Sequence, residues 1–236
     1  MLRFMFGEPK REAGGKLLEA YRLMERFASL AGERADNGQD KDLALRKYEI
    51  WTQGLIVSLD ELEQSHYAAL RFKERIRSAS VSEMSEQELD DYHRYLYFDK
   101  NGFIRLFAIL DKLGTLLNDM LELHTERIKP HFSYFTVLRN MRDRNVHPEL
   151  TKLLDEVKIR TKDATNRLRK RRNTEIHYMN AEMVDDLAFR RRLPEEEPKL
   201  ENISAQAYDL SVGMELVVDS LIICFRFACD WLRTRQ

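Results

Sequence analysis

An arginine and a histidine at the end of a strongly basic stretch have the types and spacing needed to cut RNA without a metal. Arg172 lies five residues before His177, within residues 167–178. An arginine guanidinium binds a phosphate through two parallel hydrogen bonds. Histidine is the side chain whose ordinary pKa suits proton transfer near neutral pH. Arg172 and His177 are therefore candidate catalytic residues.

The residues that lead into this pair are expected to form one helix, which begins at Pro148 and carries the basic stretch to Arg172. Its apolar and small residues recur every three or four positions, and the next inward position falls on Arg171 or Arg172. A guanidinium where the pattern calls for leucine departs from a local rule, and such departures are expected at functional sites. The residues of the inward face are Leu153, Val157, Thr161, Ala164 and Leu168.

Helix geometry limits how Arg172 and His177 can act together. Five residues along a regular helix leave two side chains about 140° apart, whereas Asn173 and His177, four residues apart, share a face. Either the helix breaks, with Asn173 or Thr174 capping a new one, or two subunits each contribute part of the site.

A second arginine and histidine with the same spacing occur earlier in the chain. Arg142 is followed by Asp143 and, after three further residues, by His147. His147 precedes a proline and is expected in an extended turn, and no long apolar stripe leads into this copy. We rank it below the first, although it could line the same cleft.

Positive charge is concentrated just before the candidate pair. The whole chain has a formal net charge of −1, but residues 158–172 contain eight basic residues and a single acid, Asp163. Such a run is often only a solvated helix face. If the run is instead an RNA-binding surface, the residues expected to bind RNA are Arg167, Arg169, Lys170 and Arg171.

The composition predicts an all-α fold in a single domain, because glycine and proline are few and helix-forming residues are abundant. A helical extension of about residues 1–40 precedes an up-and-down bundle of long helices that ends in a long helix. Asn101-Gly102 is the clearest turn signal. A helical piece around residues 179–189 and a charged linker at about 190–200 come before the last helix. The other expected helices cover residues 16–30, 43–78, 82–97, 103–129 and 203–232, and residues 132–141 are expected to form a short helix or a turn.

Other features favour a cytoplasmic protein without a metal or cofactor. The six histidines have no metal-ligand spacing, and no glycine-rich phosphate loop occurs. Cys224 and Cys229 are expected to be reduced core residues. No signal peptide is visible, and charged residues interrupt the apolar segment at 210–231, which indicates a buried helix and no membrane association.

The order Arg172, Asn173, three further residues and His177, after a basic amphipathic helix, resembles the ribonuclease motif of the HEPN superfamily. The resemblance implies a homodimer whose two motifs face each other across a cleft. His177 would act as general base or acid, Arg172 would hold the scissile phosphate, and Asn173 would orient the site. It also implies RNA as substrate, a role in toxin or phage-defence systems, and a protein partner such as an antitoxin.

Two alternatives remain open on the sequence. One is an inactive HEPN-like module that binds RNA or a protein partner through the basic face at residues 158–172. The other is an all-α scaffold that has no role with nucleic acid.

Overall fold

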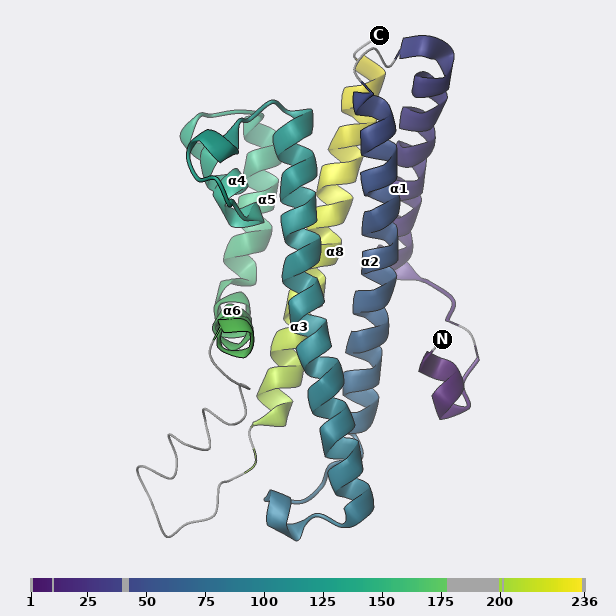
Figure 1. Ribbon diagram of the computed structural model, residues 1–236, viewed down its shortest axis with the longest axis vertical. Helices are drawn as coiled ribbons and strands as arrows, with labels where there is room; N and C mark the ends of the chain where they lie inside the picture. Colours follow the sequence, from purple (N-terminus) through teal and green to yellow (C-terminus); the bar gives the residue numbers. More distant parts are fainter. Residues whose placement is uncertain (1, 10, 40–42, 178–199, 201, 235–236) are drawn as a thin grey trace. The chain divides into compact units, whose positions relative to one another are not determined.

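The computed structural model describes residues 2–9, 11–39, 43–177, 200 and 202–234 (Figure 1). The elements in these ranges are α-helices and shorter helical turns, and no strand lies among them. The prediction of an all-α fold with long helices and a long C-terminal helix is therefore confirmed. The long helices are α1 (Gly15–Arg34), α2 (Ala44–Lys73), α3 (Glu86–Met120) and α8 (Ile203–Thr234). The shorter ones are α4 (Tyr134–Asp143), α5 (Pro148–Arg160) and α6 (Lys162–His177).

The chain divides into two compact units, and α2, α3 and α8 contribute to both. The first unit comprises Met1–Lys10, Leu62–Arg105 and Thr161–Met214. The second comprises Arg11–Glu61, Leu106–Arg160 and Glu215–Gln236. The helix expected around residues 179–189 and the linker expected at 190–200 lie outside the described residues, apart from Leu200.

The core of the first unit is built from the second half of α2, the first half of α3, α6 and the first half of α8. Its fully buried side chains include Leu62, Tyr95, Phe103, Leu168 and Leu210. A short N-terminal 3-10 helix, Leu2–Phe6, packs on the same unit. The Phe6 ring lies 5.1 Å from that of Phe72, measured between centroids.

The second unit is built from α1, α4 and α5 with the remaining halves of the long helices. Phe27 of α1 packs edge to face on Phe225 of α8, with ring centroids 5.4 Å apart. The buried Tyr134 hydroxyl donates a hydrogen bond to Ser220 Oγ at 3.1 Å. Both cysteines, which lie on α8, are free and buried, as expected.

The turn predicted at Asn101-Gly102 is wrong, because α3 runs through both residues without a break. Gly102 is buried, and a Cβ atom there would lie 2.9 Å from a methyl carbon of Leu210 on α8. Asn101 accepts a hydrogen bond from Arg105 Nε at 2.6 Å within the same helix. The glycine therefore serves close packing between helices and not a reversal of the chain.

Two other predicted helix boundaries differ from the structure. The helix expected to reach residue 129 ends at Met120, where Glu122 and His124 take left-handed backbone conformations with φ near 50°. The helix expected from Pro148 to Arg172 is two helices, α5 and α6, divided at the buried Thr161. Its start at Pro148 is confirmed. Within the described ranges, no helix is both long and apolar enough to cross a membrane.

Candidate functional site

Helix α6, drawn in green in Figure 1, carries the candidate residues. Its inward face is formed by residues three or four positions apart, as the sequence pattern predicts. Ala164 and Leu168 are buried, and the next inward positions are Arg171 and Glu175. On α5 the inward residue is Leu154, whereas Leu153, which was assigned to this face, has 48% of its surface exposed. The guanidinium that takes the place of a core residue thus belongs to Arg171.

Arg171 is held by two groups on α3. Its Nη2 donates to the carboxylate of Asp99, which is completely buried. Its guanidinium also lies over the ring of Phe103, 5.0 Å from the centroid. Burial raises the pKa of the Asp99 carboxyl, and the positive charge of Arg171 opposes that rise.

Two further ion pairs fasten α6 on either side of Arg171. Arg167 donates from Nε and Nη2 to the two carboxylate oxygens of Asp209 on α8, at 2.8 and 2.6 Å. This bidentate pair raises the pKa of the Arg167 guanidinium. Lys100 Nζ of α3 lies 3.2 Å from a carboxylate oxygen of Glu175. Two of the four residues predicted to bind RNA, Arg167 and Arg171, are therefore engaged with buried carboxylates.

The opposite, outer face of α6 is exposed and polar. Asn166, Lys170, Asn173 and His177 follow one another at intervals of four, three and four residues, and all four are exposed. The side chains of Lys170, Asn173 and His177 form no hydrogen bond or ion pair with the residues that the structure describes. These side chains have no structural task in the described part of the protein, which leaves them available to a ligand.

Arg172 lies on the flank of α6 between the two faces and is half-buried, as is Arg169. The helix α6 (Lys162–His177) continues through Asn173 and Thr174, so the first of the two alternatives, a helix break at these residues, is wrong. On an unbroken helix Arg172 and His177 point about 140° apart. A single α6 cannot direct both side chains at one phosphate.

The second arginine–histidine copy belongs to the second unit. Arg142, near the end of α4, is exposed and has its Nη1 atom 3.9 Å from Asp155. His147 has a left-handed backbone with φ of 44°, not the extended conformation expected before a proline. Its carbonyl accepts the Thr151 amide at 3.0 Å, and its ring packs edge to face on Phe227, with centroids 5.0 Å apart. His147 thus lies directly before α5, and its ring packs on Phe227 of α8.

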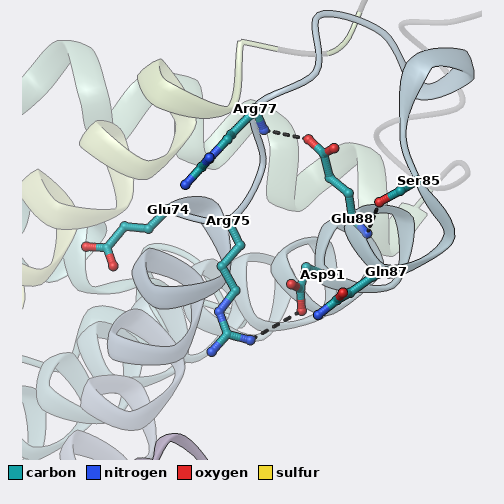
Figure 2. Close-up of a pocket in the computed structure, with 7 residues that line it drawn as sticks. All are labelled: Glu74, Arg75, Arg77, Ser85, Gln87, Glu88 and Asp91. Carbon is teal, nitrogen blue, oxygen red and sulfur yellow. Dashed lines mark hydrogen bonds and ion pairs between the residues drawn. The ribbon is translucent and has the colours of Figure 1, made fainter.

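A polar cavity of about 430 Å³ at the connection between α2 and α3 was not found from the sequence. Figure 2 shows its lining residues, with Arg75 directed at Asp91 and the Glu88 carboxylate directed at the backbone amide of Arg77. Glu88 accepts hydrogen bonds from the amides of Arg77 and Ser78 at 2.5 and 2.7 Å, which lowers the pKa of its carboxyl. Arg75 Nη1 lies 3.7 Å from the buried carboxylate of Asp91. These contacts hold the connection between α2 and α3 in shape.

A histidine–serine contact in the first unit has the distance of a catalytic pair but not its hydrogen-bond arrangement. His66 Nε2 lies 2.8 Å from Ser211 Oγ, but the serine hydroxyl donates to the carbonyl of Ala207 at 2.9 Å. The imidazole must then donate its Nε2 proton to the serine oxygen, so it cannot remove a proton from it. Among the described residues, no group of three His, Cys, Asp or Glu side chains is placed to hold a metal ion.

The long helices and the long final helix agree with the HEPN resemblance predicted from the sequence. Residues 51–229 match the family model described as Cthe2314-like HEPN, and this match spans most of α2, all of α3 to α6 and most of α8. The chain belongs to that HEPN family. No protein of curated function and no solved structure matches the chain.

Proposed function

We propose that this protein is a metal-independent endoribonuclease whose site is formed by Arg172, Asn173 and His177. HEPN domains are often ribonucleases, which supports the reaction class. The observation that supports the proposal is that some side chains of α6 are held in ion pairs while others are exposed. Arg167 and Arg171 are used in ion pairs, while Asn173 and His177 share an exposed face beside Arg172.

In the proposed reaction the RNA supplies its own nucleophile. His177 takes the proton from a ribose 2′-hydroxyl, the 2′-oxygen forms a bond to the adjacent phosphorus, and the bond from phosphorus to the 5′-oxygen breaks. A general acid returns a proton to the leaving 5′-oxygen. The products are a 2′,3′-cyclic phosphate and a 5′-hydroxyl. Arg172 binds the non-bridging phosphate oxygens and stabilises the charge that develops on them, and Asn173 orients the bound group.

The site is proposed to be complete only in a homodimer. Because α6 is unbroken, Arg172 and His177 of one chain diverge by about 140°. In a two-fold dimer with the exposed faces of α6 opposed, Arg172 of one protomer meets His177 of the other across a shared cleft. Each such pair of Arg172 and His177 then forms one site, so the dimer holds two.

The second candidate function is an inactive module that binds RNA or a protein partner, such as an antitoxin, through the same exposed face. Lys170 favours it, since this exposed cation suits phosphate binding whether or not cleavage follows. For the active enzyme we propose a toxin or phage-defence role. We place the protein in the cytoplasm because both cysteines are free thiols.

The test is cleavage of a mixed RNA pool in EDTA by the wild type, His177→Ala and His147→Ala. We expect loss of cleavage in His177→Ala only, with RNA binding retained. Loss in His147→Ala alone would move the site to the second copy. Salt-sensitive RNA binding without cleavage by the wild type would favour the inactive module, and neither binding nor cleavage would favour a scaffold.

A further inference from the structure

We propose that Asp99 is a positioning residue of the ribonuclease site, acting through Arg171 to fix the rotation of α6 about its own axis. This inference rests on the proposed function, because it concerns the residues that α6 presents to RNA. It also assigns Arg171 to the support of the site and removes it from the RNA-binding surface.

The basic stretch contains several cations that could pair with Asp99. Residues 169–172 are Arg, Lys, Arg and Arg, so a neighbouring carboxylate could accept any of several cations. A rotation of α6 by one residue, about 100°, would place Arg172 against Asp99 and turn the face that carries His177 away from its present direction. Charge alone therefore does not define which side of α6 faces outward.

Because Asp99 is buried, its carboxylate depends strongly on the cation that pairs with it. Asp99 is completely buried, and its ionised carboxylate is strongly disfavoured unless a cation is placed on it. Arg171 meets that need and also covers the Phe103 ring one turn further along α3. Lysine would supply the charge without the flat guanidinium that stacks on the ring.

The ion pairs on either side exclude the alternative rotations. Arg167, Arg171 and Glu175 lie at four-residue intervals, on one stripe of α6. Their partners differ in charge, since Asp209 and Asp99 are acids and Lys100 is a base. A helix rotated by one residue would bring Leu168 to Asp209 and Ile176 to Lys100, so only the observed rotation satisfies all three partners.

The experiment compares single-turnover cleavage of RNA by the full-length wild type, Asp99→Asn, Arg171→Lys and a matched control, Tyr95→Phe. Tyr95 is also buried on α3, and its hydroxyl bonds to the Ile203 carbonyl and Gln206 of α8. The control thus loses a buried polar contact of the same unit and keeps both members of the Asp99–Arg171 pair. Hydrogen exchange of the α6 amides is measured on all four proteins.

We expect Asp99→Asn and Arg171→Lys to lower the maximal cleavage rate about 100-fold, because displacement of reacting groups by about 1 Å costs that much. The RNA concentration at half-maximal rate should stay near the wild-type value, since Lys170 still meets the backbone. Exchange should quicken in α6. If both variants cleave as fast as Tyr95→Phe, Asp99 does not position the site.

Failure of the proposed function gives a different result. If the wild type does not cleave RNA at all, that function falls, and with it the catalytic part of this inference. Hydrogen exchange still decides whether Asp99 fixes α6: faster exchange in Asp99→Asn than in Tyr95→Phe supports the anchor, and equal exchange overturns it.

Discussion

Arg171 and Arg172 are adjacent in the sequence, yet Arg171 is paired with the buried carboxylate of Asp99, whereas Arg172 lies half-buried on the flank of α6 beside the exposed face. A turn of 100° between neighbouring residues separates them. The two arginines therefore occupy different environments on α6.

Replacement of Arg172 by lysine should slow RNA cleavage on the order of 100-fold, which is the effect of removing one donor that stabilises charge in a transition state. Lysine keeps the charge but loses the two parallel hydrogen bonds. Single-turnover rates at saturating RNA measure the effect. Lys170→Arg is the control, because it exchanges the same two residue types on the exposed face. If Arg172→Lys cleaves like the parent, Arg172 does not bind the phosphate bidentately.

Mixtures of two inactive variants should recover activity if the site is shared between protomers. His177→Ala and Arg172→Ala are each expected to be inactive. Random pairing makes half the dimers mixed, each with one intact site out of two, so roughly a quarter of the wild-type rate should return. The rates are measured after unfolding and refolding the variants together. No recovery, with mixed dimers shown to form, would contradict a site built from two chains.

Lys170→Ala should weaken RNA binding and flatten its dependence on salt. Each phosphate contact to a single strand contributes about 0.7 to the slope of log K against log salt, so the slope should fall by about that amount. Fluorescence anisotropy in a salt series, with a catalytically inactive background, measures it. Lys152→Ala, another exposed lysine but on α5, should leave the slope unchanged. An unchanged slope for Lys170→Ala would remove this residue from the RNA contact.

The pH dependence of stability should reveal the half-buried imidazole of His66. Burial lowers its pKa in the folded protein from the ordinary value of 6.5, against the weaker opposing effect of Glu63. The unfolded chain then binds a proton more readily, so stability should fall as pH drops below 6.5 and level off below the folded pKa. Denaturant unfolding of the parent and His66→Gln should show the two curves diverging in acid. Proton NMR titration that gives an unshifted imidazole would disprove this explanation.

The features that depend on local sequence were predictable. Helix-forming composition predicted the all-α fold, the proline at 148 marked the start of α5, and the long apolar segment near the C-terminus marked α8. The inward face of α6 also followed from its periodicity as far as Leu168. Each of these signals lies within a few residues of the structure it specifies.

The features that depend on distant partners were not predictable. Whether Arg171 or Arg172 turns inward is decided by Asp99, 72 residues away, and the role of Arg167 by Asp209, 42 residues away. Neither carboxylate is marked as buried by its own neighbours in the sequence. The prediction of a turn at Gly102 was wrong for the same reason, because this glycine packs against Leu210, which lies on another helix.

That explanation of Gly102 can be tested against a second glycine in the middle of a long helix. An alanine at 102 would place its Cβ 2.9 Å from the fully buried Leu210, and such overpacking costs about 1–3 kcal/mol. Gly54 of α2 is exposed and has open space around a Cβ, so alanine there should stabilise the protein by about 0.5–1 kcal/mol. The two changes are chemically identical, and only packing separates them. Chemical denaturation should therefore give shifts of opposite sign, and a stabilising Gly102→Ala would show that α3 and α8 do not require a glycine at their contact.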